Sequence, residues 1–168
     1  MLRISSTAVC AAFLLCAGPA LAKTRTLLAE GSPFMTFDLP QSWKTSEIER
    51  GLEIHSSDGE AYVWIESYTP AQQKTVFAEH DRYFSAQGVK TRGEPTKQEP
   101  QVSQGKTIVY LEFDATWKSE PTLLRYALVD PRTRSGRQVI VVYWTSPDAS
   151  KRFDEDVLTM TETLELAP

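Results

Sequence analysis

Apolar and polar residues alternate along the clearest short segments of the chain, a pattern that predicts β-strands. Segment 34–39 alternates in this way and places its odd-numbered residues on one face. Segments 52–55 and 61–68 are also strand-like, and Asp58-Gly59 between them is a strong signal for a hairpin turn. The first part of the chain is therefore expected to form one strand followed by a β-hairpin.

Two later segments have helical apolar spacing, and each follows a capping residue and a proline. Thr69-Pro70 begins the first and Ser146-Pro147 the second, while Gly88 ends the first. The apolar stripes consist of Val76, Phe77, His80, Tyr83 and Phe84 in the first helix and Phe153, Val157, Met160 and Leu164 in the second. Each helix therefore has one face suited to packing on a sheet.

Between these helices, segments 107–117, 122–130 and 138–145 predict three long strands, and segment 94–102 predicts a weaker edge strand. Both faces of the last two long strands carry apolar residues, so we expect cover on both sides of the sheet. The sequence thus predicts the α+β class, with an antiparallel β-sheet flanked by helices.

Symmetry about the connecting loops predicts how the three long strands pair. Trp117 is expected opposite Thr122, and Tyr126 opposite Val142. One apolar face then collects Leu111, Phe113, Ala115, Leu124, Tyr126, Leu128, Ile140, Val142 and Trp144. A slip of one residue would scatter this set over both faces, so we favour this register.

The same register predicts a polar row on the opposite face of the sheet. Asp114 would lie opposite Arg125, and Arg125 opposite Tyr143, with Glu112 on the same face. A carboxylate, a guanidinium and a phenol in one row could bind a small polar ligand. The competing interpretation, which we favour, is an ordinary cross-strand ion pair worth about 0.2–1 kcal/mol.

A second candidate surface is the aromatic stripe Tyr62, Trp64 and Tyr68, which lies on one face of segment 61–68. It could stack against a sugar or a peptide. Such stripes more often belong to the core beneath a helix, and we favour that interpretation.

The first 22 residues have the order of a secretory signal peptide: Arg3, then an apolar stretch, then a small-x-small site that ends at Ala22. The apolar run is short for a membrane span and is interrupted by Gly18-Pro19. We therefore predict a periplasmic or secreted protein that begins at Lys23, with residues 23–168 as one domain and no stable membrane insertion after cleavage.

Composition narrows the possible chemistry further. Both cysteines lie within the first 22 residues, so the mature chain has no disulfide and no thiol nucleophile. Only Arg3 of the 18 basic residues is lost with the signal, which leaves 17 basic and 22 acidic side chains and a net charge of −5. This balance argues against a nucleic-acid partner. The only histidines, His55 and His80, lack a partner at metal-ligand spacing, so no metal or cofactor is predicted.

The order of elements resembles the PsbP-like domains, a group that includes the extrinsic photosystem protein, a Ran-binding nuclear factor and DcrB-like exported proteins. The resemblance rests on segment 34–43, where a strand is followed by Pro40, a short gap and Trp43, and on the later hairpin, helix, strands and closing helix. It implies a PsbP-like α/β/α sandwich over nearly the whole mature chain, with Pro40 and Trp43 as packing residues. It transfers almost no function.

Two classes of function remain open. The first is an exported, non-catalytic accessory or binding protein whose partner is another envelope protein or a small ligand. The second is a small periplasmic hydrolase that uses the row of Asp114, Arg125 and Tyr143. We favour the first and assign no catalytic residue, because the sequence shows no nucleophile beside a base and no cofactor motif.

Overall fold

The computed structural model describes residues 22–168, so the predicted signal peptide lies outside the described residues except for Ala22. The strands are β1 (Ala22–Ala29), β2 (Ser32–Pro40), β3 (Lys44–Ile48), β4 (Gly51–His55), β5 (Ala61–Tyr68), β6 (Val89–Lys97), β7 (Gln101–Ser103), β8 (Lys106–Trp117), β9 (Glu120–Asp130), β10 (Gln138–Thr145) and β11 (Glu165–Leu166). The helices are α1 (Gln73–Ala86), preceded by the 3₁₀ turn η1 (Pro70–Gln72), and α2 (Pro147–Glu162).

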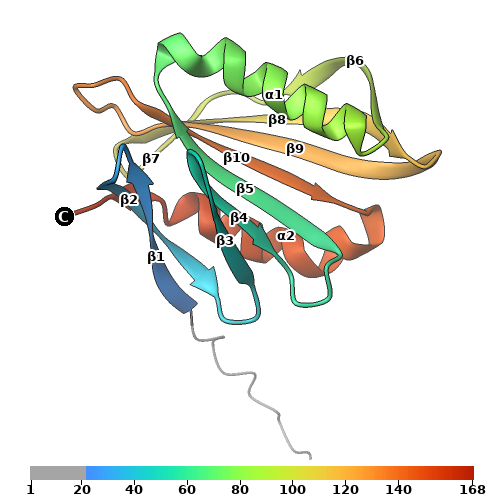
Figure 1. The fold of residues 1–168 in the computed structure, drawn as a ribbon, viewed down its shortest axis with the longest axis horizontal. Coiled ribbons are helices and arrows are strands. Elements are labelled where there is room, and N and C mark those ends of the chain that lie inside the picture. The colour runs from blue at the N-terminus through green and yellow to red at the C-terminus, as the bar shows by residue number, and fades with distance from the viewer. Residues whose placement is uncertain (1–21) are drawn as a thin grey trace, which may run out of the picture.

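These elements form three layers around an eight-stranded sheet (Figure 1). The strand order is β3-β4-β5-β10-β9-β8-β6, and β7 pairs with β8. Helix α1 covers one face of this sheet, and α2 covers part of the other. A small sheet of order β1-β2-β11 packs beside α2 on that second face. The predicted α+β class, with an antiparallel sheet flanked by helices, is confirmed.

The sheet separates two apolar cores, as expected from strands that are apolar on both faces. The core beneath α1 contains the whole set predicted for one face: Leu111, Phe113, Ala115, Leu124, Tyr126, Leu128, Ile140, Val142 and Trp144. The core on the α2 side includes Val129, Val139 and Val141 from the same strands. The predicted assignment of residues to faces is therefore correct.

The predicted pairing of β8 with β9 is wrong by two residues. Trp117 lies opposite Glu120 instead of Thr122, because Lys118 and Ser119 form a two-residue turn in which both have positive φ, at 51° and 71°. Such turns usually carry Gly or Asn, so this sequence gives no signal for it. The predicted pairing of β9 with β10, with Tyr126 opposite Val142, is confirmed.

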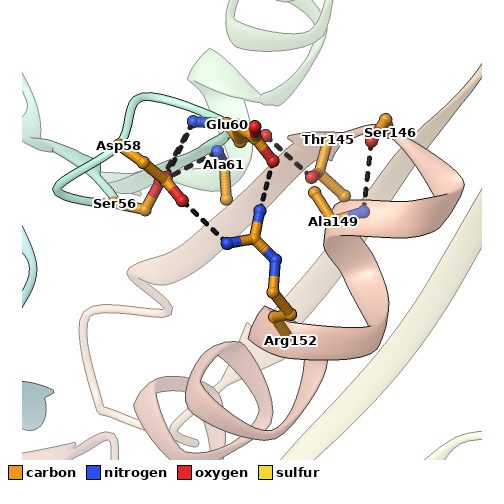
Figure 2. Close-up of polar contacts among 8 residues, drawn as sticks. All are labelled: Ser56, Asp58, Glu60, Ala61, Thr145, Ser146, Ala149 and Arg152. Carbon is orange, nitrogen blue, oxygen red and sulfur yellow. Dashed lines mark hydrogen bonds and ion pairs between the residues drawn. The ribbon is translucent and has the colours of Figure 1, made fainter.

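A polar clamp fixes α2 to the hairpin turn between β4 and β5 (Figure 2). Arg152 on α2 donates to Asp58 at 2.9 Å and also binds Glu60. At the start of the helix, Ser146 Oγ accepts a hydrogen bond from Ala149 N at 3.1 Å, as expected for an N-terminal cap. These contacts hold the first turns of α2 over the end of the sheet, and thereby position the cleft described next.

Candidate ligand-binding groove beside α2

Helix α2 leaves part of the sheet face uncovered, and a cleft of about 450 Å³ lies there. We call it the α2 groove. Its floor includes Tyr110, Ala127 and Val141 on the three long strands, and its rim includes Leu158 of α2 together with Gln98 and Gln101. The volume falls within the range of about 300–1,000 Å³ that is typical of small-ligand sites.

One end of the α2 groove is built around Arg125 on β9. Arg125 Nε donates to Glu112 Oε2 at 2.7 Å, and Arg125 Nη1 donates to Asp154 Oδ2 at 2.8 Å. Tyr143 on β10 lies opposite Arg125, as predicted. Burial alone would lower the pKa of Arg125, but the two carboxylates outweigh it and raise the pKa, so this guanidinium is always charged.

The predicted partner of Arg125 requires a correction. Because of the two-residue turn after Trp117, Glu112 lies opposite Arg125, whereas Asp114 lies opposite Leu123. Asp114 remains exposed and does not line the α2 groove. Glu112 takes the place predicted for Asp114, and Asp154 of α2 supplies a second carboxylate beside Arg125 that the sequence analysis did not predict.

Tyr143 supplies a buried polar atom without a partner. The residue is only 3% exposed, lines the α2 groove, and has no hydrogen-bond partner for its hydroxyl among the described residues. Burial raises the pKa of Tyr143, and so do the nearby charge of Asp154 and a contact with its carboxylate that is too poorly aligned to count as a hydrogen bond, so the phenol stays neutral at physiological pH. A buried hydroxyl without a partner costs about 1–3 kcal/mol, which a bound ligand or water would recover.

The predicted aromatic stripe lies beneath α1 instead of on an open surface. Trp64 and Tyr68 are 6% and 0% exposed, and Tyr62 is half-buried and stacks on Trp64 with ring centroids 6.1 Å apart. Trp64 also packs edge-on against Phe84 of α1 at 5.6 Å. This placement fits the interpretation of the stripe as core.

The structure also reveals a buried charged cluster that the sequence did not predict. Glu66 on β5 lies 2.9 Å from His80 on α1 and accepts a hydrogen bond from Arg50 at 3.0 Å. The contact with His80 is poorly aligned for a hydrogen bond. The cluster borders a smaller cleft of about 190 Å³ together with Trp64 and Tyr83.

Within residues 22–168, no group of three or more His, Cys, Asp or Glu side chains is placed to hold a metal ion. Neither helix in this part of the chain has the length and apolar character needed to cross a membrane.

Comparison with known proteins identifies the fold. No family model and no curated protein sequence matches the chain. Among solved structures, cyanobacterial PsbP (CyanoP) from Synechocystis sp. PCC 6803 aligns with a TM-score of 0.61 at 11% identity, covering 95% of this chain and 98% of that one.

Two further solved structures have the same architecture. The Ran-binding protein Mog1p of Saccharomyces cerevisiae aligns with a TM-score of 0.53 at 10% identity, covering 88% of this chain and 96% of its own. LpqN of Mycobacterium tuberculosis, described as involved in cell envelope biogenesis, aligns with a TM-score of 0.51 at 10% identity, covering 91% and 88%.

The chain therefore has the PsbP-like fold, as the arrangement around Pro40 and Trp43 suggested. At 10–11% identity these similarities establish the fold alone. In this chain Trp43 is 5% exposed and donates to Asp156 of α2 at 2.7 Å, which is a packing role.

Proposed function

We propose that this chain is an exported, non-catalytic accessory or binding protein of the cell envelope that holds a ligand or partner in the α2 groove. The observation that carries the proposal is the buried hydroxyl of Tyr143, which lines an open cleft and lacks a hydrogen-bond partner. Buried polar atoms in native proteins are nearly always paired, so an exception in a cleft favours a binding site.

The proposed location rests on the signal-like order of residues 1–22 and on the absence of cysteine from residues 23–168. The fold-level similarities fit an accessory or binding role, because one of these proteins is described as Ran-binding and another as involved in cell envelope biogenesis. They support the class of function and name no partner for this chain.

The alternative, a small hydrolase, would use the polar end of the α2 groove. Glu112 and Asp154 each have one oxygen bound to Arg125, and the remaining polar group nearby is the neutral phenol of Tyr143. This arrangement lacks a nucleophile activated by an adjacent base, which most hydrolases without a metal require. We therefore favour binding over catalysis.

Site-specific photo-crosslinking in the producing cells tests the proposal. A photoreactive amino acid is placed at Leu158, on the rim of the α2 groove, or at Leu28, on β1; both leucines are 46% exposed. We expect an adduct at Leu158 and none at Leu28. Equal labelling at the two positions, or no adduct at Leu158, would contradict a binding role for the groove.

Two further measurements address export and catalysis. The intact mass of the exported protein should correspond to a chain that begins at Lys23. A mass that retains residues 1–22 would contradict cleavage. A hydrolase screen should find no turnover, and turnover abolished by Arg125→Ala at unchanged stability would favour the enzyme instead.

A further inference from the structure

The charged side chains that line the α2 groove favour a ligand that carries a positive charge. Arg125 supplies one positive charge, whereas Glu112, Asp154 and Glu162 supply three negative charges. Arg125 is already bound to two carboxylates, so it has little attraction left for an anion. The local net charge is negative, and opposite charges attract more strongly in a partly desolvated cleft than in water.

The polar end also presents a matching set of free acceptors. Glu112 binds Arg125 through Oε2 alone, and Asp154 binds it through Oδ2 alone. The Tyr143 hydroxyl lies beside Asp154 but makes no well-aligned hydrogen bond. A primary ammonium group has three N–H donors and no acceptor, so it suits a site of three oxygen atoms.

Next to this polar end lies an apolar floor. Ala127 and Val141 are 5% and 2% exposed, and Val157 of α2 lies above them at the side of the groove. A hydrocarbon stem that leads away from the charged group would cover this floor and remove apolar surface from water.

From this geometry we infer that the α2 groove binds a small amphipathic amine, with its ammonium group between Glu112, Asp154 and Tyr143 and its apolar stem over Ala127 and Val141. The inference rests on the proposed binding function and adds the chemical class of the ligand. A small molecule fits better than a protein surface, because a cleft of about 450 Å³ holds a short chain, whereas a stable protein interface buries about 1,200 Å² or more.

Calorimetric titration of the purified exported protein tests the inference with two probes that share an eight-carbon chain and carry opposite charges, octylammonium and octanoate. We expect octylammonium to bind at least about ten-fold more tightly than octanoate. A ten-fold difference in affinity corresponds to the contribution of one charge-assisted hydrogen bond. Equal binding, preference for octanoate, or no binding of either probe would overturn it.

Three variants locate the site. Glu112→Gln, Asp154→Asn and Tyr143→Phe should each weaken octylammonium binding, the two charge changes by about ten-fold. Tyr143→Phe removes only an unpaired hydroxyl, so it should fold at least as well as the wild type. Glu155→Gln is the matched control, since it makes the same charge change on α2 outside the groove and should alter affinity by less than about two-fold. An equal loss in Glu155→Gln would overturn the assignment.

A third probe, the peptide acetyl-Leu-Lys-Leu-amide, distinguishes a free amine from a lysine of a partner protein. Binding of this peptide about ten-fold more tightly than octylammonium would overturn the small-ligand assignment in favour of a partner's basic side chain. Crosslinking at Leu158 decides the binding function separately. An adduct there combined with a preference for octanoate would reject the amine and retain the groove as a binding site.

Discussion

His80 Nε2 on α1 lies 2.9 Å from Glu66 Oε1 on β5, and the two side chains are only 7% and 5% exposed. Arg50 binds the other oxygen of the same carboxylate at 3.0 Å. This buried contact links α1 to the central sheet. A buried pair does not add much stability over an apolar substitute, but the loss of one member is costly.

Glu66→Gln should therefore lower the free energy of unfolding by about 3 kcal/mol at pH 7, because Arg50 loses its buried counter-charge. Urea denaturation with an unchanged m-value measures the loss. Glu79→Gln is the matched control: Glu79 also binds Arg50, but its side chain is 37% exposed, so the loss should be at most about 1 kcal/mol. Equal losses in the two variants would contradict the role of Glu66 as the buried counter-charge of Arg50.

The same pair predicts how stability changes with pH. Burial alone would raise the pKa of Glu66, but His80 and Arg50 outweigh it and hold the pKa below its usual value of 4.5. A depressed carboxyl pKa stabilises the fold above 4.5, and this contribution is lost as the pH falls below that value. The difference in unfolding free energy between wild type and Glu66→Gln should therefore shrink below pH 4.5. A constant difference down to pH 2 would argue against the shift.

Asp58 lies at the surface, in the polar clamp between α2 and the hairpin turn, and its lowered pKa can be tested there. Hydrogen bonds from Ser56 and then from the Glu60 backbone lower the pKa of Asp58 from 3.8 to about 2, and Arg152 contributes less. Any stabilisation is thus present above pH 3.8 and is lost as the pH falls toward 2. In an NMR titration, Ser56→Ala should raise this pKa more than Arg152→Ala does. The reverse order would show that the arginine dominates.

Gly51 at the start of β4 allows the backbone of β5 to approach closely. A Cβ atom at this position would lie 1.9 Å from the carbonyl oxygen of Ile65, which cannot move aside as a flexible side chain would. Gly51→Ala should therefore cost about 2 kcal/mol or more of unfolding free energy. Ser46→Ala, an exposed change on the adjacent strand β3, should cost less than about 0.5 kcal/mol. If Gly51→Ala were as stable as wild type, the close approach would be wrong.

Phe113 on β8 packs against Tyr126 on β9 in the core beneath α1, with ring centroids 4.9 Å apart. Phe113→Ala should lower the unfolding free energy by about 3 kcal/mol, measured by urea denaturation. Asp114→Ala, the next residue, is exposed on the other face and should change it by less than about 0.5 kcal/mol. A larger effect at Asp114 than at Phe113 would mean that the faces of β8 are exchanged.

Several elements could be predicted from the sequence because their signals are local. The strand Ala61–Tyr68 and the strand Gln138–Thr145 have the predicted bounds, and Ser146-Pro147 begins α2 as expected. Alternation along a strand determines which residues share a face, and a capping residue followed by proline determines where a helix begins. Neither depends on the rest of the fold.

Strands β1 and β3 could not be predicted, because neither carries a local pattern of alternating apolar and polar residues. In β1 only Leu27 is buried, and no residue of β3 is fully buried, so neither shows a clear alternation. Each lies at the edge of its sheet and has a neighbour on one side only. Edge strands of this kind are held by backbone hydrogen bonds, which any sequence can form, and so they leave little trace in the side-chain pattern.

The sequence by itself determined the faces of the long strands, the two helices and the apolar set that forms the core beneath α1. Only the tertiary structure decided that Glu112 lies opposite Arg125, that Asp154 completes the polar end of the α2 groove, and that His80 meets Glu66. A register shift of two residues leaves every side chain on its predicted face, because side chains alternate with a period of two. Contacts between elements far apart in sequence depend on how the layers pack, and the pattern within each element carries no information about that.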